Sequence, residues 1–308
     1  MLLEIQTSSK EGNAVAASMT TDEPWTVKRI LDWTIGFLKE KESETPRLDA
    51  EVLLAHAMKC HRIQLYTQFD HPLTDTQRSV MRDLVKRRAA REPVAYLVGH
   101  REFFSLDFLV KPGVFIPRPD TEILVMATLD LLKGMESPKA LELCAGSGCI
   151  PIAIVKNHPT VQMQTVELNP QVAEVTQANI DKHQVGNRVT LHIGNLFEPV
   201  SSTERFHVIV SNPPYVQRDE IATLAADIRD HEPHLALDGG EDGLDVIRQI
   251  AAQSPDHLVP DGWLLFELSP EQADAGKQIL TDLNYRDVSV KNDLSGQARV
   301  VMGRNPVA

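Results

Sequence analysis

The fold is decided by a short apolar run and the glycine-rich loop that follows it, Lys139-Ala140-Leu141-Glu142-Leu143-Cys144-Ala145-Gly146-Ser147-Gly148. The run predicts a buried strand, and the residues from Ile150 to Val155 predict the start of a helix. In a strand, glycine turn and helix the backbone approaches a ligand closely, and the first N–H groups of the helix point at it. Taken alone, the loop is equally well explained as a tight turn.

This loop differs from two familiar phosphate-binding loops. The dinucleotide fingerprint G-x-G-x-x-G needs a small third residue, and Pro151 stands at that position. A phosphate loop needs a Lys-Ser or Lys-Thr pair, and none follows Gly148. The loop therefore matches neither the dinucleotide-binding nor the phosphate-binding pattern.

Strands and helices alternate outward from the loop. The apolar runs predict strands near 139–144, 161–166, 189–193, 206–211, 262–268, 286–291 and 299–303. Helical spacing predicts helices near 120–133, 148–157, 170–183, 242–256 and 270–282. This is the pattern of an α/β protein with a doubly wound, seven-stranded, Rossmann-like sheet, in which ligands bind at the carboxyl ends of the strands. The stretch 216–241 has little periodicity and predicts a lid or substrate loop.

An acidic residue ends the second predicted strand. Glu167 lies 19 positions beyond Gly148, and Asn169 and Pro170 follow it as the cap and first residue of a helix. An acid about 20 residues past a glycine loop can accept both hydroxyls of a ribose. We favour this role over a solvated strand end because the spacing suits a nucleoside cofactor.

The fourth predicted strand, 206–211, ends in Asn212-Pro213-Pro214-Tyr215. The two prolines end the strand because neither can donate to a ladder. The rigid turn offers the Asn212 side-chain carbonyl, backbone carbonyls and the Tyr215 ring, which together can hold a planar NH2 group. Accepting both N–H bonds favours a pyramidal nitrogen with a localised lone pair, which an amide otherwise lacks. An isolated match would be only a turn, but a glycine loop and a ribose acid upstream indicate an S-adenosylmethionine site and methyl transfer to nitrogen.

The rest of the chain divides into segments of different composition. Residues 1–21 predict a flexible tail, with Met19 as an alternative natural start, and 22–92 predict a helical substrate-recognition domain. Residues 93–118 predict a hairpin linker, and 119–308 the methyltransferase domain. A basic stretch runs through Arg78, Arg82, Lys86, Arg87, Arg88, Arg91 and Arg101. We interpret it first as a solvated helix face and second as a docking surface for an acidic protein or RNA.

The composition fits an intracellular enzyme. The 308 residues carry a net charge of −12, which argues against a general nucleic-acid binder. No apolar run approaches the roughly 20 residues that span a bilayer, and the N-terminus lacks a secretory pattern. Cys60, Cys144 and Cys149 have no metal-ligand spacing, so free thiols in a reducing cytoplasm are expected and no metal is.

At this point the chain resembles the HemK-type, or PrmC, peptide-chain release factor glutamine methyltransferases from about Trp25 to Arg304. The resemblance rests on the glycine loop, on Asn212-Pro213-Pro214-Tyr215, and on these further landmarks: Arg47-Leu48-Asp49-Ala50-Glu51-Val52-Leu53-Leu54-Ala55-His56, Pro93-Val94-Ala95-Tyr96-Leu97, Glu102-Phe103-Phe104, Ile116-Pro117-Arg118-Pro119-Asp120-Thr121-Glu122, Glu232-Pro233, Gly239-Gly240-Glu241-Asp242-Gly243-Leu244 and Asp293-Leu294-Ser295-Gly296. It implies a helical N-terminal domain, a hairpin and a seven-stranded methyltransferase domain. It also implies the substrate, the glutamine of the Gly-Gly-Gln motif in class I release factors, methylated on N5.

The resemblance implies a role for each site residue. Asn212 and Pro213 would accept the glutamine N–H bonds, with Pro214 stiffening the corner, while Tyr215 and Phe103 would sandwich the amide. The donor would be bound by Glu142, Cys144, Ala145, Gly146, Ser147, Gly148, Glu167, Asn195, Leu196 and Asn212. Cys144 stands where the family usually has Gly, Glu167 and Asn195 stand where it has Asp, and Ser269 replaces a usual Gly after Glu267. None of these departures removes a group that the chemistry needs.

Three other functions are compatible with parts of this pattern. A DNA or RNA amino-methyltransferase can use the same N-P-P-Y chemistry but should carry a basic cleft. A glutamine methyltransferase acting on a ribosomal protein is closer, although the segment from Pro117 to Glu122 favours the release-factor branch. A binding module with an idle donor pocket is the third. We expect a monomer that acts on class I release factors, without direct contact to nucleic acid or membrane.

Overall fold

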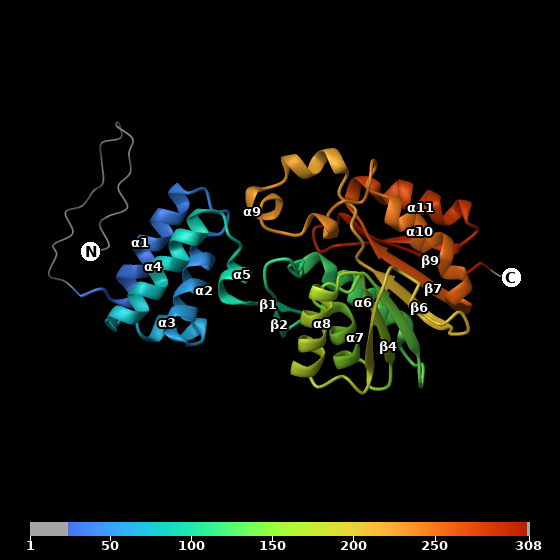
Figure 1. Ribbon diagram of the computed structural model, residues 1–308, viewed down its shortest axis with the longest axis horizontal. Coiled ribbons are helices and arrows are strands. Elements are labelled where there is room, and N and C mark those ends of the chain that lie inside the picture. Colours follow the sequence, from blue (N-terminus) through green and yellow to red (C-terminus); the bar gives the residue numbers. More distant parts are fainter. Residues whose placement is uncertain (1–23, 307–308) are drawn as a thin grey trace. The chain divides into compact units, whose positions relative to one another are not determined.

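The computed structural model describes residues 24–306, which form two compact units, one ending at Val98 and the other beginning at Gly99 (Figure 1). The tail expected at 1–21 and the alternative start at Met19 lie outside the described residues. Within residues 24–306 the structure contains no helix that is both long and apolar enough to cross a bilayer.

The first unit is helical. Its helices are α1 (Val27–Glu40), α2 (Pro46–Met58), α3 (Arg62–Thr67), α4 (Asp75–Ala89) and α5 (Val94–Val98). Thr74 caps α4 by accepting from the backbone N–H of Gln77 at 3.2 Å, and Gln77 returns a bond to the Thr74 N–H, as the capping-box pattern requires. Leucine, isoleucine and valine side chains from α1, α2, α4 and α5 form one buried cluster. The unit thus extends through α5, beyond the boundary expected at residue 92.

Most of the basic stretch on α4 is engaged in ion pairs inside the first unit. Arg88 Nε donates to Asp49 Oδ2 at 2.7 Å, with both side chains buried. Arg87 pairs with Glu92, and Arg91 with Glu42. These guanidinium groups therefore hold helices and loops of their own unit together, and Arg88 is buried rather than part of a solvated face.

A hairpin opens the second unit. Strands β1 (His100–Phe103) and β2 (Leu106–Leu109) are antiparallel and are joined by Phe104 and Ser105. Both turn residues have positive φ, 51° and 58°, as a two-residue turn matching the strand twist requires. The predicted hairpin is present, but it is part of the second unit rather than a free-standing linker over 93–118.

The second unit is built on the seven-stranded sheet expected from the sequence. In chain order its strands are β3 (Lys139–Leu143), β4 (Gln162–Glu167), β5 (Val189–Ile193), β6 (Phe206–Ser211), β7 (Leu258–Glu267), β8 (Arg286–Asn292) and β9 (Ala298–Arg304). Their order across the sheet is β5-β4-β3-β6-β7-β9-β8, and only β9 runs antiparallel to both its neighbours. The order reverses between β3 and β6, which is where doubly wound proteins bind ligands.

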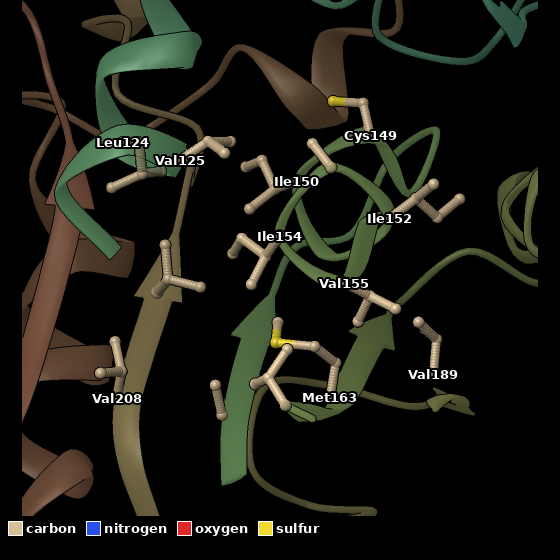
Figure 2. Close-up of a cluster of buried hydrophobic side chains, with 14 of the residues drawn as sticks. Leu124, Val125, Cys149, Ile150, Ile152, Ile154, Val155, Met163, Val189 and Val208 are labelled. Atoms are coloured by element: carbon tan, nitrogen blue, oxygen red, sulfur yellow. The ribbon is translucent and has the colours of Figure 1, made fainter. Parts of the chain in front are cut away.

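Helices cover both faces of this sheet. They are α6 (Glu122–Leu132), α7 (Cys149–Asn157), α8 (Pro170–Lys182), α10 (Asp245–Gln253) and α11 (Ala273–Asp282). Successive strand residues alternate between two buried clusters: Val208 and Val210 pack with α6 and α7, whereas Ile209 packs with α10 and α11. Figure 2 shows the first cluster, with Ile150 and Ile154 on α7 and Val208 on β6.

The expected helix at 242–256 begins only at Asp245. Gly240 and Gly243 have φ of 97° and 76°, a left-handed backbone that a helix cannot include. The stretch 216–241 is not featureless, because it contains α9 (Ala226–Arg229) and two 3-10 turns, Arg218–Thr223 and His234–Ala236. This compact loop supplies part of the wall of the site.

Candidate active site

A cavity of about 270 Å³ opens where β3, β4 and β6 end. Parallel pairing sets Leu143 beside both Val166 and Ser211, so the segments that follow the three strands meet at one edge of the sheet. Eleven of the residues singled out from the sequence line the cavity: Cys144, Ala145, Gly146, Ser147, Glu167, Asn195, Leu196, Asn212, Pro213, Pro214 and Tyr215. These segments, far apart in the chain, therefore form one wall.

The glycine loop is held in place from two sides. The Ala145 N–H donates to the Val166 carbonyl at 3.0 Å, and Thr176 Oγ1 of α8 donates to the Gly146 carbonyl at 2.7 Å. Gly148 does not line the cavity. It has φ of 77°, and a Cβ there would lie 2.9 Å from Thr176 Cγ2. The lack of a side chain at Gly148 permits close packing of α7 against α8 and the left-handed start of α7.

The Glu167 carboxylate joins the glycine loop to the end of β4. Its Oε2 accepts from the Gly146 N–H at 2.8 Å and its Oε1 from the Asn169 N–H at 2.9 Å. Burial raises the pKa of Glu167, and the backbone donors partly offset this effect. A carboxylate has about four lone-pair sites, so both oxygens keep acceptor capacity toward the cavity.

The thiol of Cys144 and the acid of Glu142, two positions apart, occupy different environments. Cys144 lines the cavity with φ of 64°, the left-handed backbone that usually requires glycine. Glu142 does not reach the cavity, because its carboxyl is fully buried and accepts a hydrogen bond from Thr165 Oγ1. Burial raises the pKa of Glu142 well above its usual value. Its expected contact with a donor is corrected: it is an interior residue beneath the loop.

The Asn212 amide is oriented from the far side of the cavity. Its Nδ2 donates to Thr121 Oγ1 at 3.2 Å, and Thr121 also lines the cavity. The preceding Ser211 donates its hydroxyl to the Leu143 carbonyl at 2.8 Å and so fixes the end of β6 against β3. Because the Asn212 nitrogen is engaged by Thr121, its Oδ1 is the side-chain atom left to accept a hydrogen bond from a ligand.

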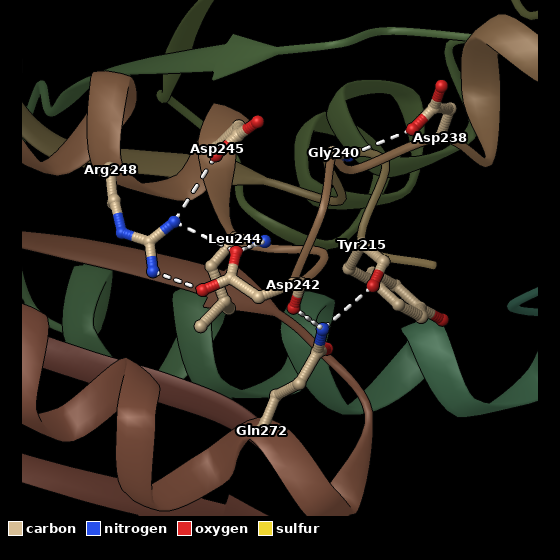
Figure 3. A network of polar contacts seen from close by, with 8 residues as sticks. All are labelled: Tyr215, Asp238, Gly240, Asp242, Leu244, Asp245, Arg248 and Gln272. Carbon is tan, nitrogen blue, oxygen red and sulfur yellow. Dashed lines mark hydrogen bonds and ion pairs between the residues drawn. The ribbon is translucent and has the colours of Figure 1, made fainter. Parts of the chain in front are cut away.

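Tyr215 is held at both ends. Its hydroxyl donates to Glu267 Oε1 at 3.2 Å, and burial raises its pKa. Its backbone carbonyl accepts from Gln272 Nε2 at 2.8 Å, and the same nitrogen donates to the Asp242 carbonyl at 3.2 Å (Figure 3). The aromatic ring therefore has a fixed position relative to Asn212.

Phe103, expected opposite Tyr215, is not at the cavity. Its side chain is 2% exposed and packs edge-on against Phe108 in the core beneath α6 and α7. Strand β1 alternates in burial, and Phe103 is its inward residue. Phe115 and Thr121 line the cavity instead. Thr121 belongs to the landmark Ile116–Glu122 and Phe115 directly precedes it. The spacing of apolar residues, however, predicted no place at the site for either.

The cavity combines a carboxylate, the carbonyl-rich Asn212 corner and apolar walls such as Leu196 and Val166. Such a lining fits a donor that carries a ribose, an adenine and a polar amino-acid end. Among residues 24–306, no three His, Cys, Asp or Glu side chains are grouped so as to hold a metal ion.

Comparisons with known proteins agree with this geometry. Residues 29–99 match the family model described as the PrmC N-terminal domain, and residues 105–241 match that of the methyltransferase small domain. A release factor glutamine methyltransferase of Geobacter sulfurreducens is 42% identical over 286 residues, which cover 92% of this chain and 99% of the relative. One of Rhodopirellula baltica is 40% identical, covering 92% of this chain and 98% of the relative.

Among solved structures, a methyltransferase from Pyrococcus furiosus superimposes with a TM-score of 0.50 at 18% identity, covering 72% of this chain and all of that structure. This similarity supports the methyltransferase fold of the second unit.

Proposed function

The chain belongs to the family of release factor glutamine methyltransferases, and from this membership and its cavity we propose the reaction it catalyses. A methyl group is transferred from S-adenosylmethionine to the side-chain N5 of the glutamine in the Gly-Gly-Gln motif of class I release factors. The observation that carries the proposal is the Asn212 amide, whose nitrogen is engaged by Thr121 and whose oxygen is left to accept.

The difficulty of this reaction lies in the substrate nitrogen. Its lone pair is delocalised into the carbonyl, so a glutamine amide is a weak nucleophile. Asn212 Oδ1 and the Pro213 carbonyl would accept its two N–H bonds and favour a pyramidal nitrogen. Tyr215, which lines the cavity, would lie against the flat amide and exclude water. Once the nitrogen carries the methyl group its proton becomes acidic and leaves to solvent, so no strong base is needed in advance.

The donor would be held by other residues that line the same cavity. Gly146 and Ser147 would approach its amino-acid end, Glu167 would accept from the ribose hydroxyls, and Asn195 with Leu196 would contact the adenine. When bound, S-adenosylmethionine supplies a methyl group on a positively charged sulfur that leaves as a neutral thioether. The residues of this chain then contribute chiefly by positioning, which can supply several kcal/mol of a barrier.

The same proposal assigns a role to the helical unit. The helical unit, which matches the PrmC N-terminal domain model, would recognise the release factor outside the glutamine pocket. We propose that the protein acts as a monomer in the cytoplasm on a protein rather than on nucleic acid. The net charge of −12 supports a protein substrate over a polyanion.

The test uses the full chain and a donor labelled on its methyl group. It is incubated separately with a class I release factor, the same factor with its Gly-Gly-Gln glutamine replaced by alanine, a ribosomal protein and nucleic acid. Label on the intact release factor alone, with one added methyl group on that glutamine by mass spectrometry, is expected. Label on the alanine variant, on the ribosomal protein or on nucleic acid instead would overturn the proposed substrate.

A further inference from the structure

A buried carboxylate joins two segments of the second unit that are far apart in the chain. Glu232, in the stretch 216–241, is 4% exposed. Its Oε2 accepts from the Ile116 N–H at 3.3 Å, and its Oε1 pairs with the guanidinium of Arg118. Ile116 and Arg118 lie 116 and 114 positions earlier, in the segment that leads into α6. One side chain thus holds the stretch 216–241 against this segment.

Residues on both sides of this junction line the cavity. Phe115 and Pro117, which flank Ile116, are lining residues, and so are four that follow Glu232: Pro233, Leu235, Ala236 and Leu237. The guanidinium carbon of Arg118 lies 4.9 Å from the centre of the Phe115 ring, so this cation contacts both the carboxylate and an aromatic lining residue. The bonds of Glu232 therefore set how closely the two groups of lining residues approach each other.

Residues 233–237 form a strap that is fixed at both ends. Glu232 directly precedes the strap and fixes its first end. At the second end the Leu237 carbonyl accepts from the N–H of Val216, the residue that follows the N-P-P-Y corner, at 2.9 Å. His234 of the strap is exposed and is not a lining residue, so the strap has one side to the cavity and one to solvent. A backbone bond secures one end, and a charged side chain secures the other.

We propose that Glu232 is a positioning residue that holds the strap against the cavity, through Ile116 and Arg118, and thereby slows the release of S-adenosylmethionine. The inference rests on the proposed function and deepens it, because the cavity is the one assigned to the donor. The lining residues of the strap are apolar, so a closed strap keeps water from the donor and buries apolar surface against it. A strap that moves away loses this contact, and the donor leaves faster.

The ion pair makes the closed position of the strap the preferred one. A buried carboxylate that has lost its cationic partner is strongly unfavourable. Because Glu232 stands in a loop and not in the sheet, it can regain water by local opening of the strap, while the core stays folded. Loss of the Arg118 charge alone should therefore open the strap, whereas loss of both charges should not.

The experiment measures the binding of S-adenosylmethionine to the full chain by calorimetry and its dissociation by stopped flow, without release factor. A pH of about 8.5 keeps an unpaired Glu232 from simply taking up a proton. Arg118→Met keeps an apolar stem over Phe115 but removes the cation, so donor Kd and dissociation rate should each rise by about tenfold or more.

Two milder changes accompany this variant. Glu232→Gln is neutral and can still accept from the Ile116 N–H, so donor Kd should rise by only about two- to fivefold. The matched control is Asp230→Asn, two positions away, which removes an exposed acid paired with Arg229. It should leave both the donor Kd and the dissociation rate at the wild-type values.

The double variant separates strap closure from a general loss of packing. Adding Glu232→Gln to Arg118→Met removes the unpaired charge, so donor Kd should return to within about threefold of Glu232→Gln alone. Hydrogen exchange of the backbone amides at 233–238 should be faster than wild type in Arg118→Met and slow again in the double variant. Exchange in β3 and β4 should match the wild type throughout, because the sheet is not involved.

A donor Kd and dissociation rate in Arg118→Met that equal those of the wild type would overturn the inference and leave the proposed function intact. So would a double variant that binds the donor more weakly than Arg118→Met does. A wild-type chain that binds the donor but never methylates release factor removes the proposed substrate, and the binding data still decide the role of Glu232. Should Arg118→Met not fold, Glu232→Gln decides alone: unchanged donor Kd and unchanged exchange at 233–238 contradict the inference.

Discussion

The side chains of Thr121 and Asn212, 91 positions apart in the chain, are joined by a hydrogen bond of 3.2 Å from Asn212 Nδ2 to Thr121 Oγ1. Thr121 is 2% exposed and stands directly before α6, whereas Asn212 follows β6. The bond leaves the amide oxygen as the group that can accept from a substrate. The loop that leads into α6 thus fixes the orientation of the Asn212 amide in the N-P-P-Y corner.

Replacing Asn212 with alanine should separate catalysis from donor binding. The variant loses the acceptor aimed at the substrate nitrogen, and loss of one such positioned group lowers kcat by about 100-fold or more. Donor Kd should change little because Glu167 and the glycine loop are untouched. Methyl transfer to release factor and calorimetric titration of the donor measure the two effects. Near-normal turnover in Asn212→Ala would refute the assigned role.

Glu167→Gln should weaken donor binding. The glutamine has the same size but loses the charge. Its single oxygen can accept from only one of the Gly146 and Asn169 N–H groups, and its NH2 group faces the other as a second donor. Hydrogen bonds to a charged group are worth about 1.5–3 kcal/mol, so donor Kd should rise roughly 10- to 100-fold. Glu174→Gln removes the charge of an exposed acid on α8 and serves as the control in the same titration. An unaltered Kd for Glu167→Gln would contradict the ribose role.

Cys144→Gly should cost almost no stability. The left-handed backbone at φ of 64° disfavours cysteine by about 1 kcal/mol. The extra freedom of glycine in the unfolded chain costs a similar amount, about 0.5–1 kcal/mol. Urea denaturation should therefore give an unfolding free energy within about 1 kcal/mol of the wild type. Ala153→Gly, in the buried middle of α7, lacks this compensation and should lose about 1 kcal/mol or more. A larger loss in Cys144→Gly than in Ala153→Gly would show that the thiol itself stabilises the loop.

Gly243→Ala should damage the site through Tyr215. A Cβ at this position would lie 2.3 Å from the Tyr215 carbonyl and 2.3 Å from Gln272 Nε2, so the two bonded groups of Figure 3 must move apart. We expect kcat to fall by about tenfold or more, because displacement by 1 Å can cost that much. Gly296→Ala is the matched control, with a similar φ of 84° but nothing within 4 Å of its Cβ. Equal kcat in the two variants would contradict the predicted effect of the clash with Tyr215.

The sequence by itself determined the sheet and the position of the site along the chain. The central strand β6 is an apolar run that Asn212 follows, the glycine loop follows the buried strand β3, and Glu167 ends β4. Parallel strands bring their carboxyl ends to one edge, so local pattern was enough to predict a common cavity. The Thr74 capping box likewise depended only on neighbouring residues.

The tertiary structure alone decided which side chains face the cavity. Phe103 is the inward residue of β1, and Glu142, two positions before the lining residue Cys144, is buried in the sheet, which is covered on both faces. The position of Gly148 depends on the approach of α8, and Glu267 accepts from Tyr215 only because β7 lies beside β6. A period of two fixes that neighbours face opposite sides, but not which side holds the ligand. That choice depends on long-range packing, which no local stretch of sequence contains.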